Sequence, residues 1–279
     1  MQTDHIDQNT CHALANALLP SVLAASEIQL SHFQASTTVI TKADRTPVTI
    51  ADRESEAVLL KALKTIAPDI AVVAEEDMAA GARPVIGDTF FLVDPLDGTR
   101  EFIANRPEFT INIALVRFGH PVFGLIYAPA LRRLYLTLGP NHAISTTVSA
   151  NAPNPTSITE LAKTRLSTRY SVPSGLVVAA SHSHMNAATE TILASLKIAR
   201  QTPMGSSLKF CRIAEGAADI YPRVGPTSEW DTAAGQAILE AAGGSVVDLA
   251  GTPLTYGHAA TGYKNPAFVA WGRSSSKTA

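Results

Sequence analysis

The sequence predicts an α/β protein, built as one large domain or as two closely packed halves. Its 279 residues exceed the roughly 100 to 200 of a typical domain, so the chain is long enough for a sizeable core. Short apolar runs bounded by glycine and proline predict strands, and apolar residues at helical spacing predict helices between several of them. In the second part of the chain the two kinds of segment alternate, which is typical of an α/β domain.

The first element is an uncharged stretch at residues 12–26, "HALANALLPSVLAAS". A secretory leader begins with basic residues, whereas here Asp4 and Asp7 come first and the first lysine or arginine is Lys42. A membrane span needs about 20 apolar residues, more than this stretch provides. We therefore expect a core helix, bent at Pro20, and no transmembrane segment.

A second helix is predicted to start near Asp52 and to end before Pro68, with Leu59, Leu63 and Ile66 at helical spacing. Asp52 stands at the position expected of the N-cap. Its carboxylate should therefore lie at the helix entrance.

Strands and further helices follow along the rest of the chain. The first half is predicted to hold strands at 70–74, 90–93, 110–117, 122–127 and 134–138. Residues 139–175 are rich in Ser, Thr, Asn and Pro, so we place the boundary there, between halves 1–145 and 146–279. The second half is predicted to hold strands at 176–180, 219–221, 245–249 and 267–271, and helices near 186–197, 206–216 and 232–242.

Charge and cysteine content narrow the class of partner. A formal net charge of −2 gives no electrostatic footprint for a nucleic-acid polymer or an anionic membrane, so any phosphate binding must be local. Cys11 and Cys211 lie far apart and have no partners at the spacing of a zinc site. A reduced, cytoplasmic setting is predicted.

Carboxylates gather where several elements end or begin. The acidic run 75–77 follows the apolar run "AVVA", Asp94 and Asp97 follow "FFLV", and Asp231 opens the helical stretch "DTAAGQAILEAAGG". Such hard oxygen ligands suit Mg²⁺, which would offset their mutual repulsion. Taken singly, however, Asp52 and Asp231 are better interpreted as N-caps than as ligands, and 75–77 as a solvated acidic turn.

Gly98 and Thr99 follow Asp97 at a predicted helix entrance, where free N–H groups can hold an anion. Metal ligands beside an anion site indicate a phosphate ester as substrate. Alone, Gly98 could be a turn residue and Thr99 a helix cap.

No Cys, Ser or His stands in a recognisable nucleophile motif, which favours direct attack by water, with inversion at phosphorus and no covalent intermediate.

The segments "EED" (75–77), "DPLDGTREF" (94–102) and "WDTAAG" (230–235) resemble, in order and spacing, the acidic loop and two signature motifs of the lithium-sensitive inositol monophosphatase superfamily. The similarity runs over nearly the whole chain. Within the superfamily, "KADRTPVTIAD" (42–52), "SHSH" (181–184), "GSSLKFC" (205–211) and "DIYPR" (219–223) are similar to the bacterial 3′(2′),5′-bisphosphate nucleotidases. The resemblance implies a layered α-β-α-β-α sandwich of the inositol monophosphatase and fructose-1,6-bisphosphatase type, with the site between the halves.

The resemblance also implies roles for individual residues. Two or three Mg²⁺ ions would be held by Glu75, Asp94, the backbone carbonyl of Leu96, Asp97 and Asp231, the first two serving one ion and the last two another. Amides of Gly98 and Thr99 would cradle phosphate. Thr99 and Asp52 would orient and help deprotonate the attacking water, which Glu75 would also contact.

Substrate choice rests on four further positions. Ser206, Lys209 and Arg223 match residues that hold the second phosphate of the nucleotide, and His184 matches a contact to the nucleoside. Lys209 could instead be a solvated helix lysine, and His184 an ordinary surface histidine. Two neighbouring positions also bear on identity: Arg100 replaces a lysine common in the nucleotidases, and Glu101 replaces an asparagine usual in inositol monophosphatases.

The predicted function is Mg²⁺-dependent hydrolysis of adenosine 3′,5′-bisphosphate to AMP and phosphate, a recycling step in sulfur assimilation. One alternative is an inositol or other sugar phosphate monoesterase on the same fold. Another is a metal-dependent nucleotide sensor without turnover, against which the water-activating set Asp52, Glu75 and Thr99 argues. The patterns leave the oligomeric state open, and they are compatible with a peripheral position on the inner face of the cell membrane.

Overall fold

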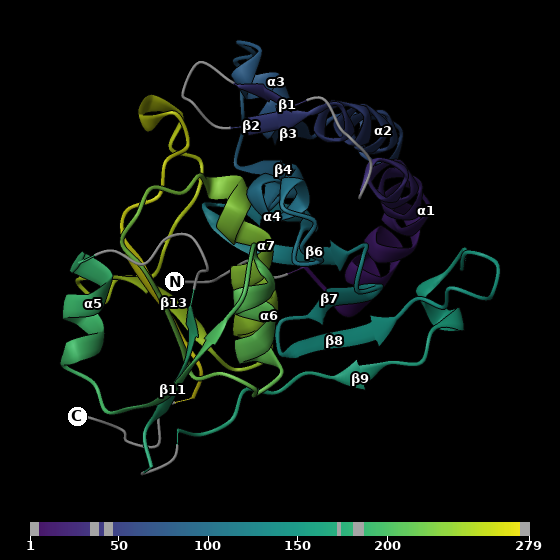
Figure 1. Cartoon of the computed structure of the whole chain (residues 1–279). Coiled ribbons are helices and arrows are strands. Elements are labelled where there is room, and N and C mark those ends of the chain that lie inside the picture. Colours follow the sequence, from purple (N-terminus) through teal and green to yellow (C-terminus); the bar gives the residue numbers. More distant parts are fainter. Residues whose placement is uncertain (1–5, 34–38, 42–46, 172–173, 181–186, 274–279) are drawn as a thin grey trace.

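Apolar side chains on both faces of a large sheet pack against helices. The computed structural model describes residues 6–33, 39–41, 47–171, 174–180 and 187–273 (Figure 1). Within them, one sheet has the order β3-β4-β5-β6-β7-β8-β9. Its strands are β3 (Ala71–Ala74), β4 (Thr89–Asp97), β5 (Thr110–Arg117), β6 (His120–Ala128), β7 (Arg133–Gly139), β8 (His142–Thr147) and β9 (Thr164–Arg165).

The two faces of this sheet enter two different cores. β3 runs parallel to β4, and the other neighbouring strands are antiparallel. Because successive side chains of a strand point to opposite faces, Phe91 and Val93 of β4 enter one core, and Phe90 and Leu92 enter the other. A strand buried on both faces explains the unbroken apolar run before Asp94.

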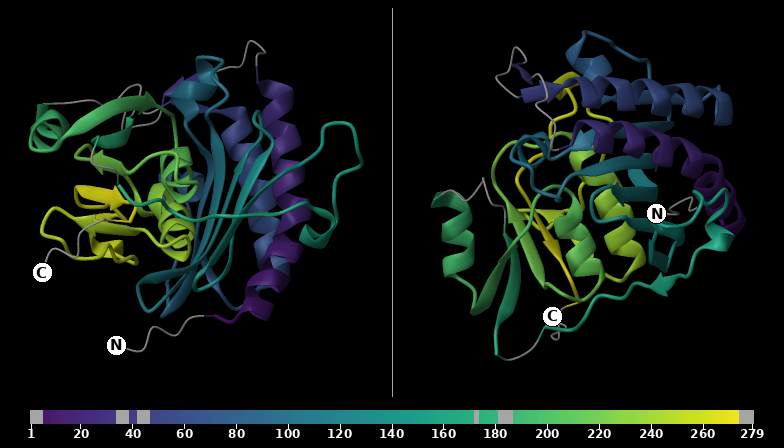
Figure 2. Two further views of the ribbon diagram at one scale, coloured as in Figure 1. Left: turned by 90° about the horizontal axis from the view of Figure 1, so that it is seen from below. Right: turned by 45° about the vertical axis from the view of Figure 1, so that its right-hand side comes forward.

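Helices α1 (Gln8–His32) and α2 (Ile50–Ile66) cover the first of these faces (Figure 2). Their residues Leu18, Leu19, Leu59 and Leu63 are fully buried. By length and composition alone α1 could cross a membrane, but 44% of its most apolar window is buried inside the structure. The predicted core helix is confirmed, and Pro20 lies inside it.

The second face packs on helices α6 (Leu208–Ala214) and α7 (Glu229–Ala241), which separate it from a second sheet. That sheet has the order β11-β10-β12-β14-β13. Its strands are β10 (Leu176–Ala180), β11 (Ile198–Pro203), β12 (Ile220–Arg223), β13 (Ser245–Asp248) and β14 (Phe268–Trp271). Helix α5 (Ala187–Ala194) covers its outer face through Leu193, which packs with Val178 and Ile220. Figure 2 shows the resulting α-β-α-β-α layers, which confirm the predicted sandwich.

Small residues let α7 lie unusually close to its neighbours. A Cβ at Gly124 of β6 would stand 2.3 Å from the backbone oxygen of Ala234, and a Cβ at Gly235 would stand 2.4 Å from the Phe210 ring. Both distances are too short for a Cβ atom, so glycine is required at both positions. The close packing fixes the first turn of α7, which carries Asp231, beside the larger sheet.

Shorter elements complete the described chain: β1 (Val39–Thr41), β2 (Pro47–Thr49), α3 (Glu75–Ala79), α4 (Thr99–Ile103), and 3-10 turns at Ile158–Glu160 and Ala259–Thr261. The prediction of a loose segment at 139–175 was wrong in part, because β8 and β9 extend the larger sheet there. Polar β8 residues are tolerated since Ser145 accepts a hydrogen bond from Arg133 and Thr146 donates one to a backbone carbonyl. The division at residue 145 stays a prediction.

Candidate active site

The end of β4 delivers two carboxylates to one cavity. The pairing of β4 with β5 shifts register between Asp94 and Asp97, and such an irregularity re-aims side chains at a strand end. Asp94 is 1% exposed, and its Oδ1 accepts a hydrogen bond of 3.0 Å from the Leu96 N–H. Both aspartates line the same cavity, as the sequence predicted for a shared site.

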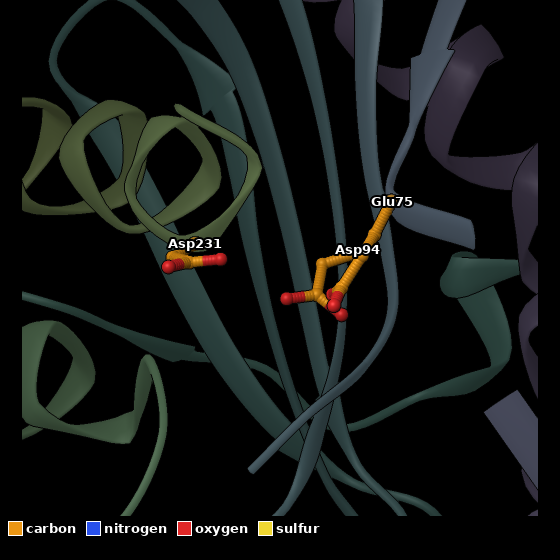
Figure 3. Close-up of side chains that lie close together, drawn as sticks. All are labelled: Glu75, Asp94 and Asp231. Atoms are coloured by element: carbon orange, nitrogen blue, oxygen red, sulfur yellow. The ribbon is translucent and has the colours of Figure 1, made fainter. Parts of the chain in front are cut away.

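Glu75 and Asp231 meet Asp94 from two other elements. Glu75 follows β3, which is parallel to β4, so both strand ends reach the same edge of the sheet. One carboxylate oxygen each from Glu75, Asp94 and Asp231 lies within 4.8 Å of the others, and Figure 3 shows the three side chains converging from separate elements. The carboxylates predicted to converge therefore do so.

The electrostatics of this cluster call for a cation. Burial, followed by the charge of Glu75, raises the pKa of Asp94 well above its usual value. Burial, followed by Asp97, raises the pKa of Asp231 to about 8. Buried like charges of this kind are costly unless a counter-ion is present. A set of carboxylate oxygens with a backbone carbonyl nearby fits a hard divalent cation such as Mg²⁺.

Asp97 is held by two residues that the sequence reasoning missed. Its Oδ2 accepts hydrogen bonds from the Ser207 N–H at 2.5 Å and from Asn112 Nδ2 at 3.3 Å. Ser207 Oγ in turn donates to Asn112 Oδ1 at 2.7 Å, which ties the two supports together. Burial raises the pKa of Asp97 to about 6, although nearby Lys209 opposes this rise. A polar residue inside the buried strand "TINIALV" was the available signal for Asn112.

Thr99 begins α4 directly after Gly98, whose φ of 95° lies in the left-handed region that favours glycine. The Thr99 hydroxyl lies 3.2 Å from Asp52 Oδ1 and 3.3 Å from the Leu96 carbonyl oxygen, in position to donate to either. Thr99 and Asp52 are therefore in contact, although Asp52 does not itself line the cavity. The predicted pair of Thr99 and Asp52 is thus brought together.

The N-termini of α2 and α7, near Asp52 and Asp231, differ from the prediction in the same way. Neither residue is the N-cap: α2 begins at Ile50 and α7 at Glu229, so each aspartate is the third helical residue. Asp52 Oδ2 accepts from the N–H of Thr49, and Asp231 Oδ2 accepts from the N–H of Ser228. This is the reciprocal half of a capping box. Each contact involves one oxygen of a carboxylate that has two, so helix capping leaves room for a functional role.

Two buried cations, Lys209 and Arg223, line the same cavity. Lys209 is only 4% exposed, so the alternative of a solvated helix lysine is wrong. Its Nζ donates to the Ser206 carbonyl at 2.6 Å and lies 5.0 Å from the centroid of the Tyr221 ring. Burial lowers the pKa of Lys209 to about 8, while the charge of Asp97 opposes that effect. Arg223 Nη2 donates to the Pro226 carbonyl, and its buried Nε has no hydrogen-bond partner among the described residues.

One cavity of about 210 Å³ gathers nearly all of the predicted site residues. They are Glu75, Asp94, Leu96, Asp97, Gly98, Thr99, Ser206, Lys209, Arg223 and Asp231. Arg100, Glu101, Tyr221 and Thr227 also line it. Asp52 lies behind Thr99, and His184 falls outside the described residues. The roles assigned to these residues stay predictions, but their common location makes one site of them.

Comparisons with known proteins agree with this geometry. The model of the inositol monophosphatase family matches residues 12–273. The 3′(2′),5′-bisphosphate nucleotidase CysQ of Shigella flexneri is 41% identical over 218 residues, covering 78% of this chain and 82% of that protein. The protein of the same name from Haemophilus influenzae is 32% identical over 266 residues, covering 95% of this chain and 94% of that protein. The crystal structure of CysQ from Bacteroides thetaiotaomicron matches with a TM-score of 0.75 and 34% identity, covering 94% of this chain and 97% of that one. The family resemblance inferred from the motifs is confirmed, and the chain belongs to the inositol monophosphatase family.

Proposed function

We propose that this enzyme hydrolyses adenosine 3′,5′-bisphosphate to AMP and phosphate. One observation carries the proposal: a single cavity is lined both by an acidic cluster and by buried Lys209 and Arg223. A substrate with two phosphates fits this lining, because one phosphate can be cleaved at the acidic cluster while the cations hold the other. An inositol monophosphate would offer the two cations no second phosphate. The curated CysQ relatives, named as bisphosphate nucleotidases, support the same substrate class.

Two or three Mg²⁺ ions would be held by the carboxylates of Glu75, Asp94, Asp97 and Asp231 and by the carbonyl of Leu96. The convergence of Glu75, Asp94 and Asp231, together with the raised pKa of Asp94, supports such a site. When bound, the metal would neutralise the cluster, activate water and stabilise the charge of the transferring phosphoryl group. Asn112 and the Ser207 N–H hold Asp97 in place for this task.

Proton handling at the attacking water falls to Thr99 and Asp52. The Thr99 hydroxyl can accept a hydrogen bond from water while it donates to Asp52 Oδ1, 3.2 Å away. The other oxygen of Asp52 accepts hydrogen bonds from the Thr49 N–H and hydroxyl at 2.8 and 2.6 Å, so Oδ1 is left to accept from Thr99. Glu75 would contact the same water. Amides of Gly98 and Thr99 would hold the scissile phosphate.

The phosphate that is not cleaved would bind to Ser206, Lys209 and Arg223. Lys209 and Arg223 are both at least nine-tenths buried, so their attraction for an anion is screened less than it would be at the surface. His184 as a contact to the nucleoside stays a prediction. The free, buried Cys11 and Cys211 support a reducing, cytoplasmic setting for the enzyme.

The test is phosphate release from adenosine 3′,5′-bisphosphate, inositol 1-phosphate and fructose 1,6-bisphosphate, each with and without Mg²⁺. We expect the nucleotide to give the highest kcat/KM and chelation of Mg²⁺ to abolish release. Faster release from inositol 1-phosphate would favour the sugar phosphate alternative. Tight nucleotide binding without phosphate release would show a sensor instead.

A further inference from the structure

The cavity contains one buried carboxylate that the metal assignment does not use, that of Glu101. It lies in α4, two residues after Thr99, and is 6% exposed. Its side chain lines the same cavity as Lys209 and Arg223. Among the described residues, none donates a hydrogen bond to this carboxylate. A buried acceptor that faces a cavity with no donor of its own is a candidate for contact with the substrate.

The fold reserves space for this side chain. A Cβ at Gly205 would stand 2.7 Å from Glu101 Cγ and 3.1 Å from Cδ, so only glycine fits beside it. Gly205 directly precedes Ser206 and Ser207, which border the cavity. The Glu101 side chain is therefore confined before any substrate binds, and a confined group loses little conformational entropy on binding.

The charge of Glu101 limits what it can bind. It attracts Lys209 and repels Asp97, and it would equally repel the phosphates of a substrate. Burying an anion beside a phosphate ester is unfavourable unless the ligand supplies a hydrogen-bond donor to it. In a nucleoside bisphosphate, the donors other than phosphate are the remaining ribose hydroxyl and the amino group of the base.

Position decides between these two donors. Gly98 and Thr99, at the start of the same short helix, are the proposed contacts of the scissile phosphate, and Glu101 follows Thr99 by only two residues in the lining of the same cavity. The hydroxyl on the carbon next to the scissile ester is close to that phosphate, whereas the base is separated from it by the ribose ring. We propose that Glu101 accepts a hydrogen bond from this vicinal ribose hydroxyl and makes the enzyme selective for ribonucleotides over deoxyribonucleotides.

This inference rests on the proposed function, and one pair of substrates tests it. kcat/KM is measured for adenosine 3′,5′-bisphosphate and 2′-deoxyadenosine 3′,5′-bisphosphate with wild type, Glu101→Met and the control Glu240→Gln. Glu240 is also a carboxylate of low exposure, but it lies near the C-terminal end of α7, far along the helix from Asp231, and does not line the cavity. A hydrogen bond to a charged acceptor predicts a wild-type preference for the ribonucleotide of about 10- to 100-fold.

In Glu101→Met this preference should fall to near one, through loss of activity on the ribonucleotide, while Glu240→Gln keeps the wild-type ratio. Glu101→Gln, which retains a neutral acceptor, should give an intermediate ratio and serves if the methionine variant does not fold. A wild-type ratio near one would overturn the proposal, and so would a full preference retained in Glu101→Met. If Glu101 had a purely structural role, Glu101→Met would lower kcat/KM for both substrates equally and leave their ratio unchanged. Wild type that hydrolyses neither nucleotide would instead refute the proposed function.

Discussion

Lys209→Met tests whether the cavity is built for a substrate with two phosphates. The substitution keeps an unbranched side chain that is one atom shorter and removes the charge of Lys209, which is buried and lines the same cavity as Arg223. Truncating one partner of a buried charge pair typically costs about 2 to 5 kcal/mol. That cost corresponds to a loss of roughly 30- to 4,000-fold in kcat/KM for adenosine 3′,5′-bisphosphate.

A second effect of the same substitution should be common to all substrates. Lys209 Nζ donates to the carbonyl of Ser206, whose φ of 49° lies in the left-handed region where a residue with a Cβ is strained. The next residue, Ser207, donates its N–H to Asp97. Loss of Lys209 can therefore loosen the support of Asp97 and lower kcat/KM for every substrate. The ratio of the kcat/KM values of two substrates, one with and one without the second phosphate, isolates the contribution of the phosphate contact.

The assay compares adenosine 3′,5′-bisphosphate with adenosine 3′-monophosphate, which lacks the second phosphate. We expect the ratio of the two kcat/KM values to fall by roughly 30-fold or more in Lys209→Met. It should be unchanged in Lys163→Met, which removes the same charge from an exposed position. Equal losses for both nucleotides would refute the contact between Lys209 and the second phosphate.

Three further predictions follow from the site and from α7. Asp97→Asn should weaken Mg²⁺ binding in a calorimetric titration and lower kcat/KM by roughly 100-fold or more; unchanged binding and turnover would remove Asp97 from the metal site. Thr99→Ala should lower kcat by about 100- to 10,000-fold with little change in KM, and Thr99→Ser should recover most of it; a loss confined to thermal stability would leave Thr99 a helix residue only. Glu240→Gln should raise the free energy of unfolding at pH 8 by about 1 to 3 kcal/mol, because burial raises the pKa of Glu240 from 4.5 to about 7 and its ionised form is disfavoured in the fold. The gain should fade as pH falls from 7 to below 4.5, where Glu240 of the wild type is protonated in both the folded and the unfolded state. A gain independent of pH would contradict this origin.

The acidic cluster could be predicted from the sequence because each of its members stands at the end or start of a local element. Asp94 and Asp97 end an unbroken apolar run, and Glu75 follows another; parallel pairing of β3 with β4 then suffices to bring them to one edge. Asp231 comes from a distant part of the chain. Its place in the cluster depends on the contact of α7 with β6, of which Gly124 is a local sign, since a Cβ there would meet the backbone of Ala234.

Other features could not be predicted because they depend on contacts between distant segments. The Ser207 N–H reaches Asp97, and the Ser207 hydroxyl reaches Asn112, only because the turn before α6 lies against the larger sheet, and a single sequence shows no sign of that contact. The burial of Lys209 likewise follows from the position of α6 between the two sheets. Polar strand β8 escaped prediction because its hydroxyls are paired with neighbouring segments, and composition alone marks such a segment as a loop.

A shared device explains how the fold keeps these carboxylates together. Four of the aspartates each accept a hydrogen bond from a backbone N–H: Asp52 from Thr49, Asp94 from Leu96, Asp97 from Ser207 and Asp231 from Ser228. A backbone donor fixes the carboxylate without placing a cationic side chain beside it. Salt bridges would have neutralised the cluster internally and removed its attraction for a divalent cation. Because these supports are neutral, they do not satisfy the cluster with positive charge, and a bound cation would relieve the repulsion that makes the pair Asp94 and Asp97 costly in the protein alone.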